Sequence, residues 1–210
     1  MRAGGEYQLR VYPHFTSIAA TAEATTLADH SVDFVTAGQA FHWFDHERAR
    51  QEFARILAAR GWVVLVWNFH RTTETPFLVA LEQFWQKDFT RERPHDAATD
   101  RDSTGPFGWT KPAESRRSRF ERARREVIGP FFEPGAFREK VFDNPLVCDW
   151  DGLKGRVLSN RIALEDEDPR LTAMLEELEG IVKAHQVDGR VTIEQDLYVI
   201  YGRLGAATQP

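Results

Sequence analysis

The chain has 210 residues, a formal net charge of -5, 42% hydrophobic residues and 28% charged residues, values that are ordinary for a globular protein. They exclude a wholly disordered chain and a collagen-like fibre, and the single Cys148 excludes a disulfide scaffold or a zinc site built on cysteines. The acidic balance gives no global reason to bind nucleic acid or an anionic membrane. Without a signal peptide or an apolar run of about 20 residues, the sequence predicts a cytoplasmic protein.

Three segments near the N-terminus are predicted to be strands. Residues 14–20 and 31–38 are rich in β-branched and apolar residues, and the second ends in a glycine. Residues 62–67 are apolar on both faces, which is typical of a strand that is covered on both sides in a parallel sheet.

Three other segments repeat their apolar residues at helical spacing. Asp45 as N-cap and Gly61 as exit predict a helix over 46–58. Pro76 begins a second predicted helix that reaches about residue 88. Pro169 begins the clearest one, which reaches about residue 186. The stripe residues of the second and third helices are Phe77, Leu78, Leu81, Phe84, Trp85, Leu171, Met174, Leu175, Leu178, Ile181, Val182 and His185.

The rest of the chain is less regular. Residues 91–118 are polar and lack periodicity, so we predict a loop or a disordered insertion. Residues 137–150 hold two extended segments, a short helix follows Asp151, and residues 190–203 alternate as a last strand. The alternation of strands and helices predicts the α/β class with a mostly parallel sheet.

Local motifs add a resemblance to this outline. The triplet Thr21-Ala-Glu23 precedes the strand Ser31-Val-Asp-Phe-Val35, whose carboxyl end continues as Ala37-Gly-Gln-Ala-Phe-His-Trp43. The next helix contains Glu52-Phe-Ala-Arg-Ile-Leu57, and the strand after it ends in Trp67-Asn68. Together these motifs resemble the class I S-adenosylmethionine-dependent methyltransferases, specifically the small-molecule branch typified by trans-aconitate methyltransferase-like proteins.

The resemblance implies a Rossmann-like methyltransferase sheet with an antiparallel last strand, and S-adenosylmethionine as cofactor. It implies an adenine contact for the loop after the family's third strand and a place beside the methionine part and the substrate for the end of the fourth. The implied cofactor-binding residues are Thr21, Ala22, Glu23, Ala37 and Gln39. The implied proton acceptor is His42, and the implied substrate-binding residues are Phe41, Trp43 and Asn68.

Two family features are absent from this sequence. The Gly-rich turn after the first strand and the acidic residue after the second have no counterpart among the 210 residues. The resemblance therefore implies an N-terminally truncated sheet that lacks its first two strands, within a single partial domain over 1–210. A strand left at an open edge of this sheet would offer a route to self-association.

Each candidate residue also has a plain structural interpretation. Thr21-Ala22-Glu23 can be an ordinary turn after a strand, and His42 a satisfied, partly buried histidine. Asn68 can simply satisfy loop backbone groups. The histidines lack the spacing of a metal site, so no metal is expected.

Six arginines lie between Arg116 and Arg125. They are either a phosphate or nucleic-acid contact or a solvated helix face balanced by nearby glutamates, and we favour the second interpretation. The sequence thus predicts methyl transfer to a small molecule, impaired in this chain. The alternative is a non-catalytic remnant that acts as a subunit or interaction module.

Overall fold

The computed structural model describes residues 12, 14–71, 73–90, 116–132, 135–159 and 169–204. It divides into two compact units. Unit one takes in Met1–Leu65, Arg122–Arg138 and Tyr201–Pro210, and unit two takes in Val66–Glu121 and Glu139–Ile200. The elements are β1 (Val32–Gly38), η1 (Phe41–Trp43), α2 (His46–Ile56), β2 (Leu57–His70), α3 (Pro76–Thr90), α4 (Arg116–Ala123), η3 (Arg124–Ile128), α5 (Gly129–Phe132), β3 (Phe137–Asp143), β4 (Leu146–Cys148), α6 (Trp150–Ser159), α7 (Pro169–His185), β5 (Val191–Ile193) and β6 (Gln195–Gly202).

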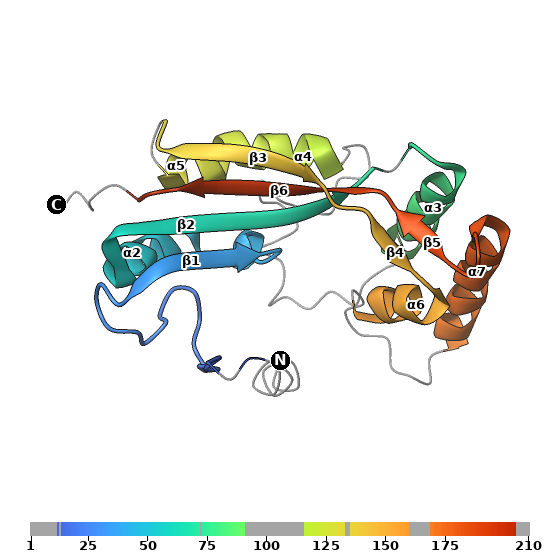
Figure 1. The fold of residues 1–210 in the computed structure, drawn as a ribbon, viewed down its shortest axis with the longest axis horizontal. Coiled ribbons are helices and arrows are strands. Elements are labelled where there is room, and N and C mark those ends of the chain that lie inside the picture. Colours follow the sequence, from blue (N-terminus) through green and yellow to red (C-terminus); the bar gives the residue numbers. More distant parts are fainter. Residues whose placement is uncertain are drawn as a thin grey trace. The chain divides into compact units, whose positions relative to one another are not determined.

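Four strands form the larger sheet, in the order β1-β2-β6-β3 (Figure 1). β1 and β2 run in the same direction, whereas β6 runs against both of its neighbours. The antiparallel last strand that the resemblance implies is confirmed: β6 lies beside β2, which is a central strand of this sheet. The expectation of a mostly parallel sheet is wrong, because β6 and β3 contribute two antiparallel pairs against one parallel pair.

The predicted strand over 14–20 is also wrong. These residues have no regular structure and are exposed. Within the described part of the chain no strand lies beside them, and an isolated strand leaves its backbone groups to water. The β-branched composition predicts a strand only where a neighbour exists to complete the ladder.

Three predicted boundaries need correction. The helix expected over 46–58 ends at Ile56, because Leu57 already has extended backbone angles (φ -70, ψ 134). Gly61 lies inside β2 instead of ending the helix, and a Cβ there would come within 2.7 Å of the Leu57 Cδ2 atom. The last strand splits into β5, which pairs with β4, and β6 of the larger sheet.

The segment 91–118 was predicted to be a loop. Its residues 91–115 lie outside the described residues. Its last three residues open α4, so the prediction was wrong there. The arginine-rich segment is helical: it begins as the α-helix α4 and continues as the π-helix η3.

Unit one packs aromatic side chains from the turn after β1, from α2 and from α5. The ring of Phe131 contacts those of Phe41 and Phe53 edge-on, at centroid distances of 4.8 and 6.1 Å. Phe41 in η1 and Ala49 in α2 are both completely buried. The Arg50 Nε donates to the carbonyl of Phe131 at 3.0 Å, which fixes α2 against α5.

Unit two has its own hydrophobic core. It joins α3, α6, α7 and β5, and the stripes predicted for the second and third helices supply most of it. α3 begins as predicted, with the Thr75 hydroxyl accepting from the Leu78 amide at 3.2 Å. The core residues are Phe77, Leu78, Leu81, Phe84, Trp85, Leu153, Val157, Leu171, Met174, Leu178, Val182, Val191 and Ile193.

Candidate functional site

The triplet Thr21-Ala22-Glu23 forms a tight turn. The Ala24 amide donates to the Thr21 carbonyl at 3.2 Å, and the two residues form an isolated antiparallel bridge. Glu23 extends away from this turn, and its Oε1 accepts a hydrogen bond from the Asp45 amide at 2.9 Å. The turn is therefore tied directly to the N-terminal end of α2.

The carboxyl end of β1 leads into the short 3-10 helix η1. Ala37 is buried, and Gln39 adopts a left-handed backbone with φ of 55°, a conformation that is uncommon outside glycine. Such strain is most often retained at functional sites. In an open α/β sheet, ligands bind at the carboxyl ends of strands, and β1 ends here.

Three of the predicted site residues make up η1, and they differ in exposure. Phe41 is completely buried and belongs to the aromatic core, so the structure favours a packing role for it. His42 is half-buried, with its ring 5.0 Å from that of Trp43. Trp43 is 55% exposed, so its indole face is open to a ligand.

His46 supports η1 from the first turn of α2. Its Nε2 lies 3.1 Å from the Phe41 carbonyl oxygen, a distance at which a protonated Nε2 donates a hydrogen bond. Its ring also lies 4.7 Å from that of Phe41. No site role was predicted for His46, although its position four residues after His42, across the start of a helix, was a usable signal.

Burial dominates the electrostatics of these groups. It lowers the pKa of His42 to about 4, with a further contribution from the charge of His46. Burial also lowers the pKa of His46, against the opposing hydrogen bond to Phe41 and the charges of Asp45 and Glu23. For Glu23, burial acts to raise the pKa, but hydrogen bonds from the Asp45 amide, its own amide and Thr21 outweigh it and lower the pKa. At neutral pH the site therefore holds a neutral His42 and an ionised Glu23.

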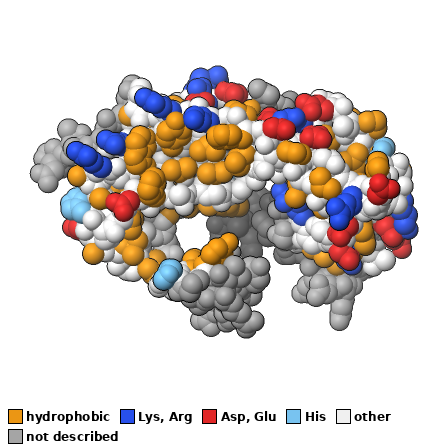
Figure 2. Space-filling model, in the orientation of Figure 1, with side chains coloured by type: hydrophobic (Ala, Val, Ile, Leu, Met, Phe, Trp, Pro, Cys, Tyr) orange, Lys and Arg blue, Asp and Glu red, His pale blue; other side chains and the backbone are white. Residues whose placement is uncertain are grey.

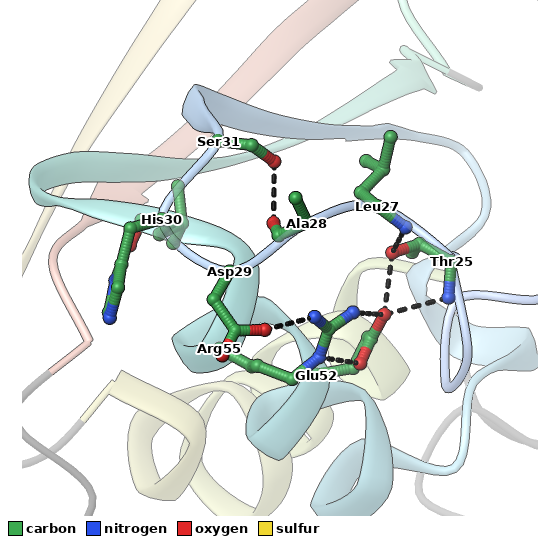
Figure 3. A network of polar contacts seen from close by, with 9 residues as sticks. Thr25, Leu27, Ala28, Asp29, His30, Ser31, Glu52 and Arg55 are labelled. Atoms are coloured by element: carbon green, nitrogen blue, oxygen red, sulfur yellow. Dashed lines mark hydrogen bonds and ion pairs between the residues drawn. The ribbon is translucent and has the colours of Figure 1, made fainter.

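A polar network behind this site fastens residues 25–31 to α2 and to the start of β2 (Figure 3). Glu52 is buried and accepts hydrogen bonds from Thr25 and Arg55. Arg55 also pairs with Asp29 through its Nη1 at 2.5 Å. The hydrogen bonds from Arg55 are the largest cause that lowers the pKa of Glu52 to about 2.

Asn68, the remaining predicted site residue, lies in unit two near the end of β2. Its Oδ1 accepts a hydrogen bond from the Asn144 Nδ2 at 3.1 Å. Arg71, three residues later, contacts Asp143 and Asp196 through its Nη2, at 2.6 Å each. These contacts fasten the residue that follows β2 to the end of β3 and to the start of β6. The pKa of Arg71 is raised, chiefly by the hydrogen bond to Asp196.

The structure thus brings together the predicted residues of unit one around the turn at 21–24 and the end of β1. Among the described residues, no group of three or more His, Cys, Asp or Glu side chains could hold a metal ion. Nor does any described helix have the length and apolar character needed to cross a membrane.

Comparison with known proteins shows what this region is similar to. Residues 2–65 match a family model described as a methyltransferase domain. An uncharacterized methyltransferase of Schizosaccharomyces pombe is 37% identical over 76 residues, which are 36% of this chain and 30% of that protein. An uncharacterized methyltransferase of Mycobacterium tuberculosis is 46% identical over 56 residues, which are 27% of this chain and 23% of that protein. The matched part of the chain thus spans less than a third of the length of each of these relatives.

A solved structure from Anaeromyxobacter dehalogenans, provisionally named a type II methyltransferase, is similar over the whole fold. It aligns with a TM-score of 0.56 and 22% identity, covering 95% of this chain and 77% of its own. At this identity the likeness shows a shared Rossmann-like methyltransferase fold. The sequence similarity of residues 2–65 covers the turn at 21–24, β1 and η1.

Proposed function

We propose that this chain takes part in methyl transfer from S-adenosylmethionine to a small-molecule acceptor. One observation carries the proposal: the residues matched to a methyltransferase domain contain the turn at 21–24 and η1, which the Glu23–Asp45 contact holds together. The trans-aconitate-like branch, the acceptor and any impairment of activity are parts of the same proposal.

The residues of unit one suit such a cofactor in part. The exposed ring of Trp43 can face a positively charged sulfonium, to which aromatic faces are attracted. The turn at Thr21 and Ala22 offers backbone groups to a base edge. When bound, S-adenosylmethionine supplies the activated methyl group. The sequence contains no Gly-rich turn, so the backbone amides that such a turn offers to a cofactor have no counterpart in it.

His42 is suited to accept a proton from the acceptor. Its lowered pKa keeps the imidazole neutral at physiological pH, the protonation state in which it can accept a proton. The same low value makes it a weak base, so a large share of any rate would come from alignment of the acceptor. Gln39 and Ala37 line the strand end beside it, and Asn68 is retained as a proposed substrate contact on β2.

The rival proposal is a non-catalytic, methyltransferase-like module. It is favoured by the missing cofactor motifs and by the exposed strand β1, whose Phe34 is 62% exposed. Figure 2 shows hydrophobic side chains gathered over the sheet on the face in view. Among the residues that the structure describes, β1 pairs only with β2, so its outer edge is the proposed site of self-association. A cytoplasmic location, with neither nucleic acid nor membrane as partner, completes the proposal.

A transfer assay separates the two proposals. The chain is incubated with S-adenosylmethionine that carries a radiolabelled methyl group and with a panel of small carboxylic acids, amines and phenols. Slow transfer that His42→Asn reduces supports methyl transfer. Absence of transfer, together with absence of S-adenosylhomocysteine binding, supports the non-catalytic module.

A further inference from the structure

Two carboxylates fasten residues 21–31, here the tethered loop, to one helix. Glu23 reaches the Asp45 amide at the N-terminal end of α2. Glu52, in the middle of α2, reaches Thr25 in the loop. Thr21 and Ala22 directly precede these two anchored positions.

The Glu52 anchor is built from charge-assisted hydrogen bonds. Its Oε1 accepts from the Thr25 amide at 2.7 Å, the Thr25 hydroxyl at 2.5 Å and the Arg55 Nη2 at 2.7 Å. Its Oε2 accepts from the Arg55 Nε at 2.9 Å. Bonds of this type are about twice as strong as neutral ones. Glu52 is only 9% exposed, so these partners supply contacts that water supplies to an exposed carboxylate.

The far end of the tethered loop is fastened as well. The amides of His30 and Ser31 donate to the carbonyls of Arg55 and Ile56, at 3.0 and 2.8 Å. Thr26 and His30 adopt left-handed backbone conformations, with φ of 63° and 53°. Strained residues persist where the surrounding contacts over-determine them, and here the anchors supply those contacts.

A purely stabilising role would not require a buried carboxylate. Apolar side chains of similar volume often stabilise a fold as well as a buried ion pair does, because they avoid the desolvation of charge. Glu52, by contrast, fixes the position of the Thr25 backbone amide relative to one face of α2. That geometry favours a role in placing the loop.

We propose that Glu52 and Glu23 are positioning residues that act as one device: Glu52 holds the tethered loop on α2, and only then does Glu23 reach Asp45 and place Thr21 and Ala22 beside η1. This inference rests on the proposed function for its consequence in binding, but the coupling between the two anchors is independent of it.

The coupling is tested by NMR of the 210-residue chain without ligand. The reporter is the Asp45 amide, which contacts Glu23 but not Glu52. In Glu52→Gln we expect the Asp45 amide to lose its hydrogen-bonded chemical shift and to exchange with solvent at least about tenfold faster, as for loss of one charged hydrogen bond. A change at the Thr25 amide with an unchanged Asp45 amide would overturn the inference.

Two further variants keep this test decisive. Thr25→Val removes one of the donors to Glu52 and keeps the side-chain shape, so it should shift the Asp45 amide in the same direction to a smaller extent, even if Glu52→Gln fails to fold. The matched control is Glu177→Gln, which breaks the exposed Lys87–Glu177 pair of unit two (2.6 Å) and should leave Asp45 unchanged.

A second measurement uses S-adenosylhomocysteine, titrated by NMR so that millimolar affinities are readable. We expect Glu23→Gln, Glu52→Gln and the double variant each to weaken binding by about tenfold, because both residues act through the same loop. A loss of about a hundredfold in the double variant would mean separate roles and would overturn the inference. If the unaltered chain shows no binding, the proposed function fails while the Asp45 result still decides the coupling.

Discussion

For His42, the sequence predicted a place in the candidate site but not the protonation state. Its place after a strand end marked it as a candidate, and the structure places it half-buried on η1 beside the exposed Trp43. Its neutral state could not be foreseen, because it depends on burial by neighbours and on the charge of His46. Likewise, Phe41 looked equally available in sequence, yet the ring of Phe131, 90 residues later, covers it.

The pKa of His42 predicts a pH dependence of stability. Its value falls from 6.5 to about 4 in the folded protein, so as the pH drops below 6.5 the unfolded chain takes up a proton first. The contribution of His42 to stability is therefore complete above pH 6.5 and is lost progressively towards pH 4. Denaturant unfolding at pH 7 and pH 5 should show a larger loss of unfolding free energy for the parent chain than for His42→Gln. Equal losses in both proteins would contradict the burial of this imidazole.

At the scale of elements, the two helices with long apolar stripes and the strands over 31–38 and 62–67 were predicted correctly, whereas the strand over 14–20 was not. α3 and α7 begin at the predicted prolines, because their stripes are long and a core exists to receive them. Residues 14–20 look like a strand but lack a neighbour. A helix face was the favoured interpretation of the arginine-rich segment, and only the first three residues of α4 were assigned to a loop. This helix buries Phe120 and Ala123. Phe120 packs on Trp67 and Phe69, contacts that no local pattern reveals.

The N-cap of α2 gives a prediction at this scale. Asp45 Oδ1 accepts from the Arg48 amide at 3.2 Å, so Asp45→Ala should lower the unfolding free energy by about 1 kcal/mol. Asp45→Asn keeps an acceptor at the same place and is the matched control, with an expected loss of only a few tenths of a kcal/mol. Thermal and urea unfolding of the three proteins measure this difference, and equal stability of Asp45→Ala and the parent would refute the cap.

The core of unit two gives another. Leu178 on α7 is completely buried, so Leu178→Ala should cost about 2–5 kcal/mol through lost burial and the cavity it leaves. Glu176→Ala, on the exposed side of the same helix, should change stability by less than about 0.5 kcal/mol. Urea unfolding checks both. A cost below about 1 kcal/mol for Leu178→Ala would mean that α7 does not pack as described.

At the scale of the molecule, two exposed edges of the larger sheet differ in character. β3 presents the charged residues Arg138, Glu139 and Lys140, which discourage pairing with another chain. Asp33 is the only charged residue among the seven residues of β1, and Phe34 on this strand is exposed. Among the described residues, the strand order places these two strands at opposite ends of the sheet.

Self-association through β1 is therefore predicted to depend on Phe34. Sedimentation velocity over a concentration series should show a dimer that grows with concentration, and Phe34→Lys should shift the protein towards monomer. Val141→Lys is the matched control on β3, since Val141 is 52% exposed on the other edge strand. A chain that stays monomeric at all concentrations, or a dimer insensitive to Phe34→Lys, would show that the edge is not used.

We propose that the turn at 21–24 and the end of β1 form one side of an S-adenosylmethionine site. Titration of the 210-residue chain with S-adenosylhomocysteine, followed residue by residue by NMR, tests it most directly. We predict weak binding, with a dissociation constant of about 10⁻⁴ M or higher, because the contacts of a Gly-rich turn and an acidic ribose ligand are missing and each is worth about tenfold or more. Chemical shift changes should concentrate at Thr21–Glu23 and Gly38–Trp43. Low-micromolar binding, or shift changes confined to unit two, would contradict this account.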